Sequence, residues 1–251
     1  MNTYAGLAGL YDAFTTDVPY EKFADLYEAI FRARGKNPRV LLDLACGTGS
    51  LVWEMSKRGY ELIAVDSSPE MLSEVRDKFD GENGMTPPVL VCQMMQELDL
   101  YGTVDAVYST LDSIDYLDED EVRKLFRRLA LFIEPEGLLI FDVFTPERFR
   151  SLDGQIFVDE TDDALCLWRA EFDEETNCLI YGMDIFTAAG KLWWREQEEH
   201  IEHAHSEAFL KAALEDAGFY DIEIIRDGPH GDKGRIFFVS QNSGKGMVKN
   251  G

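Results

Sequence analysis

The sequence predicts one α/β domain, residues 1–240, in which a doubly wound, mostly parallel sheet of seven strands carries a small inserted antiparallel sheet. Two observations predict this fold class. In the first half, short apolar segments bounded by turn residues alternate with amphipathic helical stretches, as in a parallel sheet with helices on both faces. After Phe144, polar and apolar residues alternate with period two, which is typical of antiparallel strands.

Five apolar segments of the first half predict the parallel strands. In chain order they are RVLLDLA, ELIAVD, VLVCQ, VDAVYST and GLLIFDVF. Two of the helices between them have clear start signals, because Ser67 with Glu70 and Asp118 with Glu121 have the spacing of a capping box. We therefore expect helices over EMLSEVRDKF and VRKLFRRLALFI.

Residues 150–204 predict the inserted sheet, which we expect to form a lid or a dimer surface. Its strands are ALCLWRAEF, CLIYGMDIF and KLWWREQEEHI, separated by the turn segments DEETN and TAAG. The helix SEAFLKAALEDAGF follows and ends at Gly218. Two closing strands, YDIEIIRDG and GRIFFVSQ, are expected to pair antiparallel through a short turn, and residues 241–251 predict a flexible tail.

Composition excludes several classes of protein. The formal net charge of −24 and the pI near 4.4 leave no basic surface for nucleic acid, so no nucleic-acid partner is expected. No apolar run approaches the ~18 residues of a membrane span. The N-terminal segment lacks the basic start and continuous apolar stretch of a signal peptide, and the four cysteines show no CxxC spacing. We therefore expect free thiols and a cytoplasmic location.

The segment DLACGTGSL joins a strand to a helix through a glycine turn that is typical of nucleotide sites. A Walker A loop needs a lysine after the second glycine, and here Ser50 stands there. A dinucleotide fingerprint needs a third glycine where this chain has Val52, although the acidic Asp66 near the expected spacing keeps that alternative open. Asp43 before the turn disfavours an anionic pyrophosphate and favours a cationic ligand.

LLDLACGTGSL followed by AVDSSPEML closely resembles the first two motifs of class I S-adenosylmethionine-dependent methyltransferases. The resemblance implies their Rossmann-like fold, methyltransferase activity and S-adenosyl-L-methionine as cofactor. It assigns Asp66 to the ribose hydroxyls, where a carboxylate can accept two hydrogen bonds from a diol. Other positions are implied to shape the methionine and ribose site or to lie beside the adenine: Asp43, Ala45, Gly47, Gly49, Ser67 and Met71.

Two downstream segments extend the resemblance. VCQMMQELDL has Met94 where many family members have an acidic residue that bonds the adenine amino group. We expect Gln93 or a backbone carbonyl to take that role, with Met94 and Met95 packing on the ring. DAVYSTLDSIDYL resembles the fourth-strand motif and implies that Thr110 and Leu111 border the cofactor. The next residue, Asp112, is a substrate-pocket candidate.

The chain short of its tail resembles a group of small bacterial methyltransferases, mostly of unknown substrate, that have an inserted antiparallel sheet. Their YD and VPY elements correspond here to segments containing Tyr11 and Tyr20. This resemblance implies that residues 1–37 form a helical cover over the cofactor, where both tyrosines contact its methionine end or the acceptor.

The histidine-rich segment EEHIEHAH is not a zinc-binding HExxH motif, and no metal site is expected there. On a strand, His203 and His205 share one face and His200 points the other way. His205, near the start of the last helix, is the second substrate-pocket candidate, as a base.

The expected function is in-line methyl transfer to a small-molecule acceptor that is neutral or cationic. Because a sulfonium is already a good leaving system, positioning and desolvation suffice and no catalytic residue is assigned. Two alternatives remain at this point, a non-catalytic S-adenosylmethionine-binding protein and a nicotinamide-dependent oxidoreductase. A homodimer through the inserted sheet, which carries Trp168, Trp193 and Trp194, is also considered.

Overall fold

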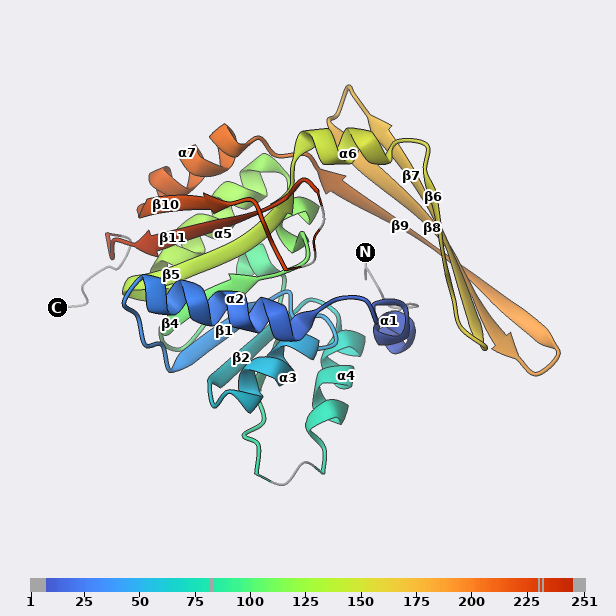
Figure 1. Cartoon of the computed structure of the whole chain (residues 1–251), viewed down its shortest axis with the longest axis horizontal. Helices are drawn as coiled ribbons and strands as arrows, with labels where there is room; N and C mark the ends of the chain where they lie inside the picture. The colour runs from blue at the N-terminus through green and yellow to red at the C-terminus, as the bar shows by residue number, and fades with distance from the viewer. Residues whose placement is uncertain (1–7, 82–83, 230, 232, 246–251) are drawn as a thin grey trace.

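A seven-stranded sheet forms the centre of the molecule in the computed structural model, which describes residues 8–81, 84–229, 231 and 233–245 (Figure 1). The strand order is β10-β11-β5-β4-β1-β2-β3. The parallel strands β1 to β5 run in this order along the chain: Val40–Leu44, Glu61–Asp66, Val89–Cys92, Val104–Ser109 and Ile133–Phe144. The strand β11 (Arg235–Asn242) is antiparallel to both β5 and β10 (Phe219–Ile225). The predicted fold class is therefore confirmed.

Helices cover both faces of this sheet. On one face, α2 (Tyr20–Ala33), α3 (Ser50–Lys57) and α4 (Pro69–Phe79) bury one apolar core against the strands. On the other face, α5 (Glu119–Phe132) and α7 (Glu207–Ala217) bury a second core (Figure 1). Because both faces are covered, the strand β1 is apolar at almost every position: Leu42 and Leu44 face one core and Leu41 the other.

The predicted capping box at the start of α5 is confirmed: the Asp118 carboxylate accepts from the Glu121 N–H, and the Glu121 carboxylate accepts from the Asp118 N–H. The prediction for α4 was wrong by one residue. Ser68, not Ser67, is the N-cap, and its hydroxyl accepts from the Met71 N–H at 3.2 Å. The reason is Pro69, which takes the first helical position and leaves the residue before it as the cap.

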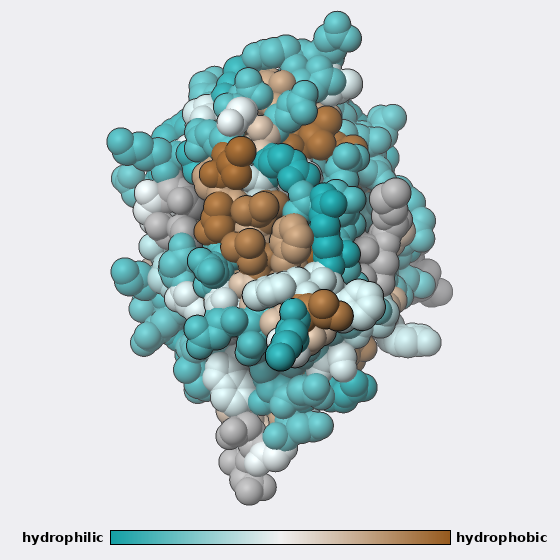
Figure 2. All heavy atoms as spheres, turned by 90° about the vertical axis from the view of Figure 1, so that its right-hand side faces the viewer, coloured by the Kyte–Doolittle hydropathy of each residue, from teal (hydrophilic) through white to brown (hydrophobic). Residues whose placement is uncertain are grey.

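The inserted sheet is a meander of four strands, β6 (Ile156–Glu160), β7 (Ala164–Asp173), β8 (Cys178–Ala189) and β9 (Leu192–His203), that projects from the body (Figure 1). The three predicted strands correspond to β7, β8 and β9, whereas β6 and the preceding helix α6 (Pro146–Leu152) were not predicted. On the face of β6 turned away from the body, Ile156 and Val158 are 65% and 56% exposed. Figure 2 views this side and shows a hydrophobic patch within a hydrophilic surface.

The remaining described elements are α1 (Ala8–Phe14) and two 3₁₀ turns, η1 (Met95–Glu97) and η2 (Ser113–Tyr116). The closing strand β11 runs two residues past the predicted start of the tail, because Asn242 is fully buried and its amide donates to the carbonyls of Ala130 and Ile133. Of the predicted tail, residues 246–251 lie outside the described part of the chain. Within the described residues, no helix has the length and apolar character to cross a membrane. All four cysteines are free.

Candidate functional site

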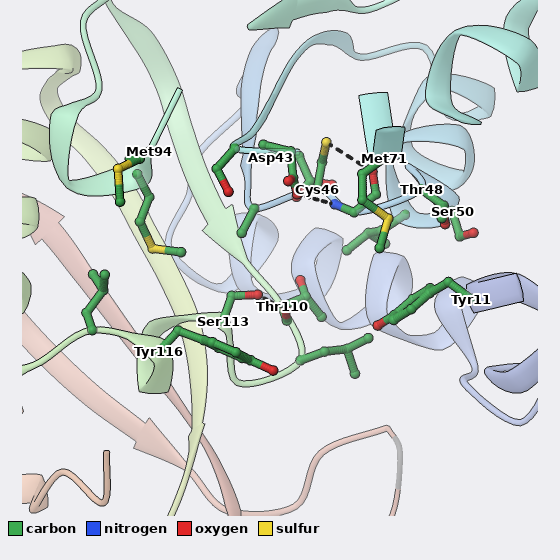
Figure 3. A pocket seen from close by; sticks show the side chains of 18 of the residues that line it. Tyr11, Asp43, Cys46, Thr48, Ser50, Met71, Met94, Thr110, Ser113 and Tyr116 are labelled. Carbon is green, nitrogen blue, oxygen red and sulfur yellow. Dashed lines mark hydrogen bonds between the residues drawn. The ribbon is translucent and has the colours of Figure 1, made fainter. Parts of the chain in front are cut away.

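A cavity of about 270 Å³ lies at the carboxyl ends of β1, β2 and β4 (Figure 3). The sheet order reverses between β1 and β4, and ligands of open α/β sheets bind at such switch points. The lining comes from α1, the glycine turn, the start of α4, η1 and the turn after β4.

The glycine turn follows β1 and depends on left-handed backbone. Ala45, Gly47 and Gly49 have φ angles of 60°, 54° and 76°. A Cβ at Gly49 would lie 2.8 Å from the Val75 side chain, so only glycine allows α3 to pack this closely against α4. Gly49 therefore shapes the cavity from behind, without lining it.

Two carboxylates stand at the ends of β1 and β2. In Asp66, Oδ2 accepts from the Gly47 N–H at 2.9 Å and Oδ1 from the Ser68 N–H at 2.8 Å, which fixes the side chain. Asp43 is 2% exposed, and its Oδ2 has no hydrogen-bond partner in the structure. Burial raises the pKa of Asp43 well above its ordinary value, with the Tyr108 hydroxyl opposing and the Asp66 charge adding to the shift. This end of the cavity favours a cation.

The helix α1 is tied to the glycine turn through Asp12. Its carboxylate accepts from the Thr48 hydroxyl at 2.5 Å and the Ser50 hydroxyl at 3.2 Å, and it pairs with Lys78 Nζ at 2.5 Å. Figure 3 shows the neighbouring Tyr11 entering the cavity from this helix. The hydrogen bonds of Asp12 thus hold Tyr11 over the cavity.

The turn after β4 is held in an unfavourable conformation. Leu111 and Asp112 both have positive φ, at 60° and 54°, which is rare for residues with a Cβ. Their N–H groups donate to the two oxygens of Asp142 on β5 at 2.9 and 3.1 Å. Arg235 on β11 pairs with Asp142 and, at 2.6 Å, with Asp112. This buried charge network fixes the turn.

Most of the residues predicted for the cofactor line this cavity: Tyr11, Tyr20, Asp43, Ala45, Gly47, Asp66, Ser67, Met71, Met94, Met95, Thr110 and Leu111. Gln93 does not, because its side-chain Oε1 accepts from the Asp99 N–H at 3.0 Å. Nine lining residues were not predicted: Cys46, Thr48, Ser50, Leu51, Gln96, Ser113, Tyr116, Leu117 and Glu121. Several of them directly follow predicted residues in the sequence, as Cys46 follows Ala45. Their position in the same turns could have identified them as lining residues.

A second cavity, of about 350 Å³, adjoins the first and shares Tyr11, Leu111 and Tyr116 with it. Its other walls include Asp112, Phe144 and Arg235 from the body. The inserted sheet contributes side chains from its inner face, which are Phe157, Asp159, Trp168, Tyr181 and Glu202. One predicted substrate-pocket residue, Asp112, is therefore part of this second cavity.

The other predicted substrate-pocket residue, His205, lines neither cavity, so its expected position at a pocket mouth was wrong. It is buried beyond the end of β9, where its Nε2 contacts the Leu117 carbonyl at 2.9 Å and its ring stacks with Phe209. Burial lowers the pKa of His205 to about 4, so it is neutral at physiological pH. No group of three or more His, Cys, Asp or Glu side chains suited to a metal occurs among the described residues.

Comparison with known proteins identifies the family. A family model described as a methyltransferase domain matches residues 41–137. The Bacillus subtilis (strain 168) protein YqeM, which carries a provisional methyltransferase name, is 28% identical over 247 residues, covering 96% of this chain and 97% of YqeM. The crystal structure of an S-adenosylmethionine-dependent methyltransferase from Clostridium acetobutylicum ATCC 824 matches with a TM-score of 0.81 and 27% identity, covering 96% and 99% of the two chains. This chain is a class I S-adenosylmethionine-dependent methyltransferase.

The fold of this methyltransferase is also that of CalS10 from Micromonospora echinaspora, an amino pentose methyltransferase whose structure contains S-adenosylmethionine. The TM-score is 0.76 at 20% identity, with 93% of this chain and 96% of CalS10 covered. S-Adenosylmethionine is the cofactor that the family assignment gives this methyltransferase. The oxidoreductase alternative, which the glycine turn alone left open, is not retained.

Proposed function

We propose that the first cavity binds S-adenosylmethionine, that the second receives a small-molecule acceptor, and that the methyl group passes between them at their shared wall. The observation that carries this proposal is that wall: Tyr11, Leu111 and Tyr116 line both cavities. The bound cofactor supplies an electrophilic methyl group. The protein's own contribution is to position the acceptor and exclude water, with the fixed turn at Leu111 between the two sites.

The chemistry of the first cavity fits the cofactor. Both oxygens of Asp66 accept one backbone N–H, and each keeps a lone pair for a ribose hydroxyl. Asp43 offers a buried, unpartnered oxygen to the positive methionine end. We assign the adenine to Met71, Met94 and Met95.

The polar group beside the adenine is not Gln93 in this assignment. Gln96 and Glu121 line the same cavity, and Gln96 Nε2 donates to Glu121 Oε1 at 3.0 Å. We therefore assign the polar adenine contacts to this pair, in place of the acidic residue that Met94 replaces.

Two observations support a small acceptor. The volume of the second cavity, about 350 Å³, is that of a site for a small organic molecule. CalS10, which shares the fold, is an amino pentose methyltransferase. In this proposal residues 8–37 act as a cover over the cofactor and residues 150–204 act as a lid over the acceptor; residues 1–7 of the predicted cover lie outside the described part of the chain.

Labelled S-adenosylmethionine and a cell metabolite extract test this function. We expect the label to appear by mass spectrometry in a small molecule, and we expect calorimetry to detect S-adenosylhomocysteine binding that Asp66→Ala weakens. Cofactor binding without transfer to any acceptor would favour the non-catalytic alternative. An unchanged dissociation constant in Asp66→Ala would refute the ribose assignment, irrespective of turnover.

We also propose a cytoplasmic location and a homodimer that forms through the inserted sheet, without nucleic acid as a partner. The four free thiols support the location. The exposed apolar side chains of Ile156 and Val158 on the outer face of β6 support the dimer. Light scattering should give the mass of two chains for the wild type and of one for Val158→Glu; a wild-type monomer would refute this contact.

A further inference from the structure

Resting on the proposed function, we propose that the acceptor is an amine whose nitrogen binds at Glu202, and that Glu202 takes up the proton which this nitrogen must lose. Glu202 is on β9, on the face of the inserted sheet that lines the second cavity. It is 3% exposed, and its Oε2 has no hydrogen-bond partner in the structure. A buried carboxylate oxygen without a donor is costly, and an ammonium or amine N–H supplies the missing donor.

The acidic side chains around Glu202 outnumber the basic ones, so the site can accept a further positive charge. From α1 and the segment after β4, the titratable groups near it are Tyr11, Asp112, Asp115 and Tyr116. The other elements contribute Arg148, Asp159, Tyr181, His200 and Arg235. Arg235, the buried cation, is already paired with Asp112 and Asp142. Two guanidiniums, of Arg148 and Arg235, thus stand against four carboxyl groups, those of Asp112, Asp115, Asp159 and Glu202. The carboxyl groups outnumber the cations, so the site favours a cationic ligand over an anionic one.

A chain of polar groups connects Glu202 with the edge of the inserted sheet. The Tyr116 hydroxyl is near enough to Glu202 to oppose the rise of its pKa, and its oxygen lies 3.1 Å from His200 Nδ1. His200 Nε2 lies 3.0 Å from Glu198 Oε2. His200 is buried, whereas Glu198 is half-buried, so the chain leads from the cavity toward solvent. Because Tyr116 also lines the cofactor cavity, the chain begins beside the place where the methyl group moves.

The proposed step balances in atoms and electrons. The ammonium form of the acceptor gives one proton to the Glu202 carboxylate and becomes a neutral amine. The nitrogen lone pair then forms a bond to the methyl carbon, and the bond from that carbon to sulfur breaks with its electron pair left on sulfur. The product is a methylated ammonium. Glu202 passes its proton to Tyr116, Tyr116 passes its own to His200 Nδ1, and a proton leaves through Glu198.

Glu202 suits an amine better than an alcohol. Burial, with the Asp112 charge adding to it, raises the pKa of Glu202 well above its ordinary value. A carboxylate with a raised pKa is a stronger base near neutral pH, which matches the deprotonation of an ammonium far better than that of an alcohol. An anionic acceptor would meet the charges of Glu202 and Asp112.

The test separates a metabolite extract by ion exchange into cationic, neutral and anionic pools and supplies each with labelled S-adenosylmethionine and the full-length enzyme. We expect the label in the cationic pool, as an N-methyl group by mass spectrometry. Label confined to the neutral or anionic pool would overturn this inference but keep the methyltransferase function. Label in no pool, with S-adenosylhomocysteine still bound, would overturn both.

Glu202→Gln keeps the shape of the side chain and removes the base, and Glu199→Gln is the matched control, because Glu199 is exposed on the opposite face of the same strand. With the labelled pool as substrate, Glu202→Gln should lower the rate at pH 7 by roughly 10² to 10⁴, the range of general base catalysis. Its rate should then rise with pH, since solution supplies the free amine. Binding of S-adenosylhomocysteine should stay within about twofold, which shows that the variant is folded. Rates equal to those of Glu199→Gln across the pH range would overturn the role of Glu202.

Discussion

The unpartnered carboxylate of Asp43 predicts that replacing it with its uncharged isostere stabilises the empty enzyme and weakens the cofactor complex. In the absence of ligand, one carboxylate oxygen is buried without a donor, and the Asp66 charge lies nearby. An unsatisfied buried polar group costs about 1–3 kcal/mol. Asp43→Asn removes the charge, so we expect a gain of about 1 kcal/mol, or about 2–4 °C in Tm for a chain of this size.

The pH dependence of this gain has a definite sign. The folded pKa of Asp43 is raised above the unfolded value, so its contribution to stability is complete below the unfolded pKa and is lost as pH rises through the folded pKa. The amide that Asp43→Asn introduces does not ionise, so the variant does not lose this stability as the pH rises. The difference in Tm between variant and wild type should therefore be larger at pH 8 than at pH 5.

Binding should change in the opposite direction. A hydrogen bond between a charged group and the ligand contributes about 1.5–3 kcal/mol, so Asp43→Asn should weaken S-adenosylhomocysteine about 10- to 150-fold. Calorimetry measures the dissociation constant, and scanning fluorimetry without ligand measures Tm at both pH values. Asp99→Asn, which removes the same charge from an exposed position, is the control. An unchanged dissociation constant together with an unchanged Tm would refute the assignment of Asp43 to the methionine end.

Three further substitutions test other parts of the site. Asp12→Ala removes the contacts that hold α1 on the glycine turn, including the Lys78 pair, so stopped-flow fluorescence should show cofactor dissociation about 3- to 10-fold faster, and an unchanged rate would exclude α1 as a cover. Asp118→Ala removes the N-cap of α5 and should lower Tm by about 2–4 °C, the equivalent of about 1 kcal/mol, in thermal melts followed by circular dichroism. Asp142→Asn removes the fully buried one of the two carboxylates paired with Arg235, and only Asp112 remains, so the fold should lose about 3–5 kcal/mol in urea titrations; a loss below about 1 kcal/mol would contradict the role given to this pair.

The sequence predicted what depends on neighbouring residues. The glycine turn and the acidic ends of β1 and β2 are local signals, and most residues predicted from them line the first cavity. Errors arose where the outcome depends on contacts between distant segments. His205 pairs with Leu117, 88 residues away, which draws it into the core and away from the cavity.

Glu202 shows why the second cavity could not be predicted in the same way. It belongs to the charged segment EEHIEHAH, which in a sequence looks like a solvated strand edge. Strand periodicity correctly separates His203 from the face of His200 and Glu202. The local sequence does not show which face of β9 meets the body of the protein, because that depends on how β9 packs beside η2. The residues around the second cavity therefore become visible as a group only in three dimensions.

Each of the two cavities contains a buried carboxylate that favours a cationic ligand. This shared feature determines the order of proton transfer and methyl transfer in the proposed reaction. The donor brings a sulfonium to a cavity with the buried Asp43, and the proposed acceptor brings an ammonium to a cavity with the buried Glu202. Each cation relieves a carboxylate that is costly in the empty enzyme, so each ligand should stabilise the fold. Both cations would nevertheless meet at the shared wall of Leu111 and Tyr116, where they repel each other and where an ammonium has no lone pair to attack with. Loss of the proton to Glu202 removes the repulsion and creates the nucleophile in the same step. Methyl transfer can therefore begin only after that proton has moved, and for this reason the base belongs beside the shared wall.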